Sequence, residues 1–171
     1  MQRERNAYQL MEFQSSSPKQ TQEIAQTLGR LLRAGDCIAA EGQLGAGKTC
    51  FAQGLAKGLA IDAVVSSPSF VLAKTYPGTP GFLHVDAYRL GSPMEFWDLG
   101  LTEQMDESVT LIEWAGNLMD ALPDDCLGLA IERVSDQERV LRFSGSAGRW
   151  QSVLDSLRAA LAQLACPESD S

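Results

Sequence analysis

One eight-residue segment, residues 42–49 with the sequence GQLGAGKT, constrains this chain more than any other feature. It matches the pattern GxxxxGK[ST], in which a glycine-rich turn joins a strand to a helix and surrounds phosphate groups. A chain of this length and composition contains the pattern by chance in about 0.4% of cases. The alternative is a glycine-rich turn that carries a lysine by coincidence.

The residues on either side supply the strand and the helix that the pattern requires. Residues 36–41 (DCIAAE) form a short, mostly apolar run that is typical of a buried strand. After the glycine-rich segment, Phe51, Leu55 and Leu59 recur at helical spacing to about Ala60. Strand, turn and helix therefore follow one another in the order that a phosphate-binding loop needs.

Each residue type in this segment has a chemical reason to face a nucleotide. Glycine permits positive φ and lets backbone amides approach a phosphate, and a helix N-terminus attracts anions. Lys48 can reach the β- and γ-phosphates, and the Thr49 hydroxyl can bind Mg²⁺. We therefore expect a site for ATP or ADP with Mg²⁺. The expected nucleotide contacts within the loop are Gly42, Leu44, Gly45, Ala46, Gly47, Lys48, Thr49 and Cys50.

Two acidic residues close apolar segments further along the chain. Asp86 ends residues 82–86 (FLHVD), and Glu113 ends residues 109–113 (VTLIE). The carboxyl ends of parallel strands meet at the crevice where nucleotides bind. We expect both carboxylates to bind the metal and, together with Lys48, to serve in catalysis. For each acid, the alternative is a solvated charge at the end of a strand.

A serine-rich segment, residues 66–70 (SSPSF), lies between the predicted loop helix and the next predicted strand. In switch-type nucleotide hydrolases this interval carries a hydroxyl that senses the γ-phosphate and the metal. Ser69 is the candidate for that role. A plain loop rich in serine and proline is the alternative.

The remaining pattern predicts an α/β protein with a mixed sheet. Strands are expected over residues 8–13, 70–76, 82–86, 109–113, 126–134 and 139–143, and helices over residues 18–33, 93–99 and 150–164. The last two strands, separated by the sequence SDQE, predict an antiparallel hairpin. The 171 residues suit one domain, in which the tail from about residue 166 is expected to fray.

Charge and composition exclude several classes of function. Fourteen basic and 22 acidic residues give a net charge of −8, and only four of the basic residues are lysines, so direct binding to a nucleic-acid backbone is disfavoured. His84 is the only histidine, which excludes a multi-histidine metal site. A Ser-His-Asp triad would have to use it without a nucleophile-elbow motif. No apolar run approaches the roughly 20 residues that span a bilayer, and no signal region opens the chain. We expect a cytoplasmic protein that does not enter the membrane.

The cysteines give no sign of a metal site. Cys37, Cys50, Cys126 and Cys166 stand singly, without CxxC spacing and without a neighbouring histidine. Ordinary buried thiols are the expected state, and disulfides or a zinc site are the alternatives.

Four segments taken together resemble one family. GQLGAGKT, SSPSF, HVDAYRL and LIEWA stand in the order and spacing of the TsaE family, small bacterial ATPases of tRNA threonylcarbamoyladenosine synthesis. The resemblance extends from about Ser15 to Phe143. It implies a P-loop NTPase fold, with a mixed central sheet flanked by helices, and a weak intrinsic ATPase.

The resemblance also implies partners. In the family, TsaD and TsaB carry out threonylcarbamoyl transfer to adenosine 37 of tRNAs that read ANN codons. The present chain would act in complex with proteins of these two types and meet tRNA only indirectly.

Roles for individual residues follow from the same resemblance. Lys48 would bind phosphates, Thr49 and Glu113 would bind Mg²⁺, and Asp86 would contact the metal or the attacking water. Trp114, which follows Glu113 as it does in the family, would contact the nucleotide, although a core tryptophan is the alternative.

Two further positions are compared with the family. The adenine lies near the serine- and threonine-containing region at residues 17–21, of which we take Thr21 as the contact. Ser69 departs from the family's usual threonine. Its hydroxyl is retained, while the missing methyl group is expected to loosen the loop.

Two other functions compete with this interpretation. A small-molecule kinase has a similar length and loop but needs an arginine-bearing lid, and no arginine or lysine occurs between Leu90 and Ile131. A regulatory nucleotide switch with negligible hydrolysis is the third possibility, since no glutamine stands in an obvious water-positioning place. No arginine finger is recognisable, and Arg89 is open to a structural interpretation.

Overall fold

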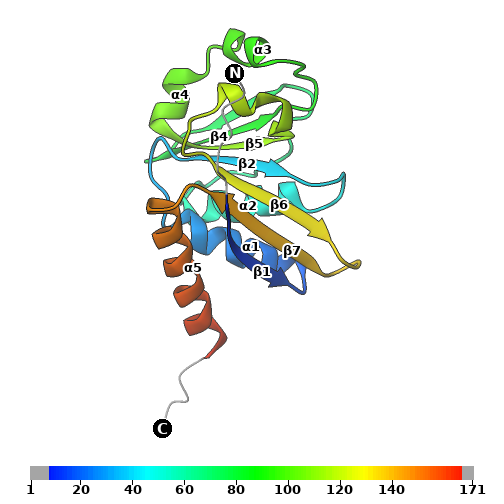
Figure 1. Ribbon diagram of the computed structural model, residues 1–171, viewed down its shortest axis with the longest axis vertical. Helices are drawn as coiled ribbons and strands as arrows, with labels where there is room; N and C mark the ends of the chain where they lie inside the picture. The colour runs from blue at the N-terminus through cyan, green and yellow to red at the C-terminus, as the bar shows by residue number, and fades with distance from the viewer. Residues whose placement is uncertain (1–7, 167–171) are drawn as a thin grey trace.

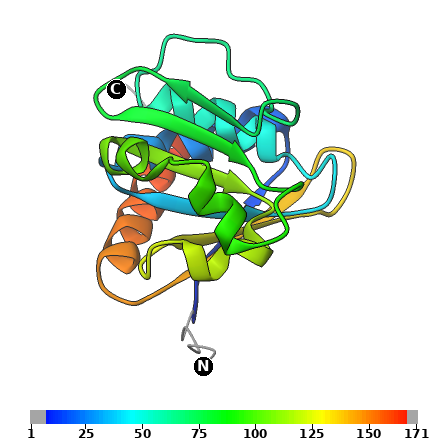
Figure 2. The same cartoon turned by 90° about the horizontal axis from the view of Figure 1, so that it is seen from above.

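Seven strands within residues 8–166, the part of the chain that the structure describes, form one twisted mixed sheet with helices on both faces (Figures 1 and 2). The structure is a computed structural model. The strands are β1 (Tyr8–Ser15), β2 (Cys37–Glu41), β3 (Ala73–Tyr76), β4 (Gly81–Asp86), β5 (Ser108–Glu113), β6 (Leu127–Arg133) and β7 (Arg139–Gly145). The helices are α1 (Pro18–Gly29), α2 (Lys48–Gly58), α3 (Pro93–Asp98), α4 (Thr102–Glu107), the 3-10 helix η1 (Ala115–Ala121) and α5 (Arg149–Ala165).

The sheet has a parallel centre and antiparallel borders. Its strand order is β1-β7-β6-β2-β5-β4-β3, in which the neighbours β6, β2, β5 and β4 run parallel. Strand β7 is antiparallel to both β6 and β1, and β3 is antiparallel to β4. The predicted mixed sheet and the predicted C-terminal hairpin are confirmed. Strand β1 pairs with β7 of that hairpin and forms the outermost strand on this side of the sheet.

Alternate residues of β2 enter two hydrophobic cores, one on each face of the sheet. Ile38 and Ala40 pack in the core that α1, α2 and α5 cover, and Cys37 and Ala39 pack in the core that α3 and η1 cover. Because β2 is buried on both faces, it reads in the sequence as a continuous apolar run. The strand that leads into the glycine-rich loop is therefore held rigidly in the centre of the protein.

The first helix begins where the sequence predicts and ends earlier. The Ser17 hydroxyl accepts a hydrogen bond from the Gln20 amide at 3.1 Å, and Pro18 occupies the first turn. The helix ends at Gly29, and a short turn follows in place of the predicted continuation to residue 33. The serine cap thus fixes the start of α1 at the end of strand β1.

One strand prediction needs correction. The strand predicted over residues 70–76 begins only at Ala73, because residues 69–72 form a turn in which Leu72 has a φ of +65°. Phe70 is 88% exposed, so the apolar character of this run does not reflect burial. The sequence analysis also missed α4 and η1, which span six and seven residues.

The described residues contain no helix that is both long enough and apolar enough to cross a bilayer. The fraying expected for the tail falls mainly on residues 167–171, which lie outside the described residues.

Candidate functional site

The glycine-rich loop, residues 42–49, leaves the carboxyl end of β2 and enters α2 at Lys48. Two of its glycines are required by geometry. Gly47, the N-cap of α2, has a φ of +112°, which residues with a side chain rarely adopt. A Cβ atom on Gly42 would lie 2.7 Å from the carbonyl oxygen of Ile131 in the neighbouring strand β6. The loop therefore packs tightly against the sheet.

Lys48 points back along this loop. Its ammonium donates hydrogen bonds to the carbonyl oxygens of Gly42 and Gln43, and its Nζ lies 4.2 Å from the centre of the Trp114 ring. Burial lowers the pKa of Lys48, while the nearby carboxylates Glu113, Glu41 and Asp86 act in the opposite direction. The lysine is thus a partly desolvated cation that faces acidic side chains.

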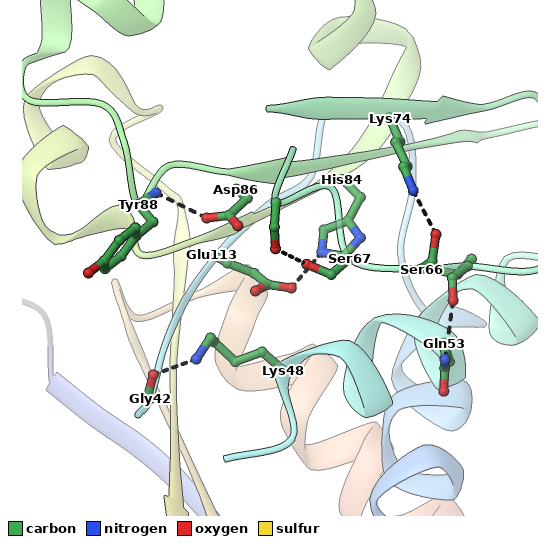
Figure 3. A network of polar contacts seen from close by, with 12 residues as sticks. Gly42, Lys48, Gln53, Ser66, Ser67, Lys74, His84, Asp86, Tyr88 and Glu113 are labelled. Atoms are coloured by element: carbon green, nitrogen blue, oxygen red, sulfur yellow. Dashed lines mark hydrogen bonds and ion pairs between the residues drawn. The ribbon is translucent and has the colours of Figure 1, made fainter. Parts of the chain in front are cut away.

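Asp86 and Glu113 come together at one edge of the sheet. They are paired in register at the carboxyl ends of β4 and β5, and Glu113 is also paired with Ala40 of β2. Both carboxylates are largely buried, with exposures of 8% and 4%. Figure 3 shows them with Lys48 beside the start of the loop. The structure therefore brings together the three residues that the sequence analysis assigned to catalysis.

His84 adds a contact that the sequence analysis missed. Its Nε2 lies 2.7 Å from Oε1 of Glu113, and both side chains are buried (Figure 3). Its Nδ1 is buried without a hydrogen-bond partner among the described residues. A signal existed in the sequence, because residues two apart on a strand share a face and His84 stands two before Asp86. The histidine orients the Glu113 carboxylate.

A cleft of about 340 Å³ opens beside Asp86. It is lined by Leu44, Ser69, Asp86, Tyr88, Arg89 and Trp114. The Ser69 hydroxyl lies 2.6 Å from that of Ser67, and Arg89 is exposed at the cleft. The predicted sensor residue Ser69 is therefore close to the predicted metal-binding acid Asp86.

Trp114 has an unusual backbone conformation. Its φ is +59°, in the left-handed region, and its amide donates a hydrogen bond to the Ala40 carbonyl at 3.0 Å. Its ring meets Tyr88 edge-on, with 5.2 Å between the ring centres, and lies over Lys48. It is half-buried and packs beside the loop lysine, unlike a fully enclosed core tryptophan.

The other residues predicted to contact the nucleotide differ in how far they are exposed to solvent. Leu44 is 93% exposed at the tip of the loop. Thr21 is buried, and its hydroxyl lies 2.7 Å from that of Ser15, so this group already has a partner within the protein. A small pocket of about 40 Å³ is lined by Pro18, Thr21, Gly47, Cys50, Gln137 and Arg139. Thr21 and Cys50 thus meet the loop at Gly47.

The oxygen donors near the loop are of the type that Mg²⁺ prefers, although they are too few to form a metal site by themselves. Among residues 8–166, no group of three or more histidine, cysteine or acidic side chains could bind a metal ion by itself. Thr49, Glu113 and Asp86 offer one hydroxyl and two carboxylates near the loop. Mg²⁺ typically takes one or two carboxylates together with phosphate oxygens and water, and this donor set matches that preference.

The four cysteines are free thiols in the structure. Cys37 and Cys126, which stand 89 residues apart in the chain, have sulfur atoms separated by 3.2 Å. The hydrogen bond between them, together with burial, raises the pKa of Cys37 well above its ordinary value. This pairing occurs at the start of β2, at the other end of that strand from the glycine-rich loop.

Comparisons with known proteins agree on one family. Residues 15–141 match the family model described as threonylcarbamoyl adenosine biosynthesis protein TsaE. The chain is 36% identical over 149 residues to the Bacillus subtilis tRNA threonylcarbamoyladenosine biosynthesis protein TsaE, covering 86% of this chain and 93% of that protein. It is 39% identical over 139 residues to the Streptomyces coelicolor protein of the same name, covering 77% and 94%.

A solved structure gives the same result for the fold. The crystal structure of YdiB from Bacillus subtilis superposes with a TM-score of 0.76 at 32% sequence identity, covering 90% of this chain and 97% of the other. The resemblance seen in the four sequence segments is therefore confirmed over most of the chain, and the protein belongs to the TsaE family of tRNA threonylcarbamoyladenosine biosynthesis proteins.

Proposed function

We propose that this protein is a Mg²⁺-dependent ATPase with a P-loop NTPase fold, required for threonylcarbamoyladenosine formation at position 37 of tRNAs that read ANN codons. One observation carries the ATPase assignment. Lys48, Asp86 and Glu113 converge beside the glycine-rich loop, at the carboxyl ends of three neighbouring parallel strands. Ligands of open α/β sheets bind at this edge.

Each residue contributes a separate action on the substrate. The loop amides and the N-terminus of α2 would bind the phosphates, and the positively charged ammonium of Lys48 would lie against them. Thr49 and Glu113 would hold a magnesium ion, which neutralises charge that develops on the transferring phosphoryl group. Asp86 would contact the metal or the attacking water, and the Ser69 hydroxyl would contact the γ-phosphate. ATP and water are converted to ADP and phosphate.

The partners follow from charge and from family membership. A net charge of −8 with four lysines gives poor binding to the tRNA backbone. We infer that TsaD-type and TsaB-type proteins bind the tRNA and that this chain docks on them. The cleft beside Ser69 would change when the γ-phosphate and the metal bind, so docking would depend on the nucleotide.

The decisive experiment measures ATP hydrolysis by the protein alone and with TsaD-type and TsaB-type partners. We expect slow hydrolysis that the partners accelerate, and its loss in Glu113→Gln, which keeps the shape of the side chain but removes its charge. Exposed Glu12→Gln is the matched control for loss of a carboxylate. Absence of hydrolysis under both conditions would contradict the proposal.

Two further measurements separate the alternatives. Pull-downs of the partners with ATP and with ADP should differ, and gel shifts of tRNA with this chain alone should show little binding at physiological salt. Transfer of phosphate to a panel of small metabolites would identify a kinase instead. Tight, salt-sensitive tRNA binding by the isolated chain would contradict the inference that the partner proteins bind the tRNA.

A further inference from the structure

Arg139, the first residue of β7, contacts both the glycine-rich loop and the turn between β6 and β7. Its Nε donates a hydrogen bond to the Ala46 carbonyl at 2.7 Å, and its Nη2 lies 3.5 Å from the Gly45 carbonyl. Its Nη1 donates to the carbonyl oxygens of Ser135 and Glu138, at 2.8 and 2.9 Å. One guanidinium therefore contacts two parts of the chain that are about 90 residues apart. Figure 2 shows the turn between β6 and β7 beside the loop that joins β2 to α2.

The bond to Ala46 has a consequence for the next amide. The Ala46 carbonyl and the Gly47 N–H belong to one planar trans peptide, so they point in opposite directions. A carbonyl fixed on Arg139 therefore turns the Gly47 N–H away from the hairpin. The preceding amide, that of Ala46, already donates to the Gln43 carbonyl at 2.9 Å. The contact between Arg139 and the Ala46 carbonyl therefore bears on the orientation of the Gly47 amide.

Gly47 is the residue at which this contact matters. Its φ of +112° is accessible to glycine, which has no Cβ to restrict it and could adopt other conformations at little cost. A hydrogen bond from a rigid, planar guanidinium selects one of those conformations before ligand arrives. Arg139 is itself half-buried and lines the small pocket that contains Gly47 and Cys50.

We propose that Arg139 is a positioning residue for nucleotide binding: it holds the Ala46–Gly47 peptide so that the Gly47 amide faces the phosphates. This inference rests on the proposed nucleotide function of the loop. Arg139 acts through the backbone of the loop and is not itself assigned a contact with the substrate.

The competing explanation is that Arg139 only closes the β6–β7 turn, through Ser135 and Glu138. Two substitutions separate these roles. Arg139→Lys keeps the positive charge but lacks the planar fork that reaches several carbonyls at once, and Arg139→Gln removes the charge as well. Arg142→Gln is the matched control, because Arg142 lies on the same strand and pairs with Glu12 and Glu132 instead of with the loop.

The first measurement is the affinity of each variant for ADP and for a non-hydrolysable ATP analogue, by titration calorimetry, together with thermal unfolding. We expect both Arg139 variants to lose affinity on the order of tenfold, as for a hydrogen bond that involves a charged group. Arg142→Gln should bind like the natural sequence. Affinity within twofold of the natural sequence in Arg139→Gln would overturn the inference. So would an affinity loss in Arg139→Gln that Arg142→Gln reproduces at equal thermal stability.

The second measurement does not need a bound nucleotide. Amide hydrogen exchange of residues 42–49 in the nucleotide-free protein should be faster in Arg139→Gln than in Arg142→Gln or the natural sequence. Equal exchange in all three proteins would overturn the positioning role even if the loop binds nucleotide. A different result is also informative. If the natural sequence binds no nucleotide but exchange is still faster in Arg139→Gln, the proposed function is contradicted, whereas the contact by which Arg139 orders the loop is supported.

Discussion

His84 and Glu113 stand on adjacent parallel strands with 2.7 Å between Nε2 and Oε1, and solvent reaches almost none of either side chain. The carboxylate is therefore not free to rotate at the edge of the sheet. One of its oxygens is fixed by the histidine, and the charge of Lys48 acts on the same group. A carboxylate held in this way would lose little conformational freedom on binding the proposed magnesium ion.

We predict that His84→Phe will reduce ATP hydrolysis at least about tenfold, since a buried carboxylate oxygen loses its partner. Phenylalanine keeps a ring next to Phe82, whose ring centre lies 5.7 Å from that of His84. Metal-free ADP binding should be nearly unchanged, because the phosphate loop is not altered. The measurement compares the Mg²⁺ dependence of hydrolysis with ADP affinity in EDTA. Equal losses in both would show that the histidine supports the fold alone.

Lys48→Met should lower ATP affinity about 10- to 100-fold, as expected when a charged hydrogen-bond partner of the phosphates is removed. The variant should nevertheless unfold at a temperature no lower than that of the natural sequence. Burial lowers the folded-state pKa of Lys48, so its charged form disfavours folding at neutral pH. That cost disappears as the pH rises past the ordinary lysine value of about 10.4. Calorimetry and thermal unfolding at two pH values test both parts, and strong destabilisation at neutral pH would disprove the second.

Two substitutions of Ser69 test the role of its hydroxyl and the effect of the methyl group that threonine would add. Ser69→Ala should slow ATP hydrolysis about 2- to 10-fold, the usual range for one neutral hydrogen bond. Ser69→Thr restores the family's residue and should hydrolyse ATP at least as fast as the natural sequence. Steady-state kinetics of the two variants provide the test. Unchanged hydrolysis in Ser69→Ala would remove this hydroxyl from the γ-phosphate site.

The cysteines should differ in their reaction with iodoacetamide. Cys166 is exposed and should be alkylated first, whereas Cys37 is buried with a raised pKa and should resist alkylation in the folded protein. Cys37 should still react slowly at a pH of about 9, because its pKa lies well above the ordinary thiol value of about 8.5. Peptide mass spectrometry at timed intervals identifies the modified residue. Early modification of Cys37 would show that the strand end at β2 opens in solution.

The sequence was sufficient for those parts of the site in which a local pattern determines the chemistry. Gly47 and Lys48 are recognisable within eight residues, and Asp86 and Glu113 each end an apolar strand. The sequence places His84 on the same strand face as Asp86, but the partners of His84, Arg139 and Cys37 could not be recognised from a local pattern. Their partners lie 29, 93 and 89 positions away, and only the strand order brings them together.

The error at residues 70–72 has a different cause. The pattern of Phe70, Val71 and Leu72 is that of a strand, yet the chain turns there, and Phe70 and Val71 face solvent. Hydrophobic runs predict burial only on average, because much of a protein surface is apolar. The residues beside the candidate sensor Ser69 are therefore the ones that pattern reasoning describes least well.

The position of β1 at the outside of the sheet affects the order in which the molecule can be completed during synthesis. Its only partner among the described strands is β7, with Tyr8 opposite Gly145. During synthesis, β1 therefore cannot pair until β7 has been translated. Such distant pairings form late because the intervening chain must close first. Arg139 belongs to the same late strand. Ala46 of the glycine-rich loop is therefore translated 93 residues before Arg139, the side chain that binds its carbonyl oxygen.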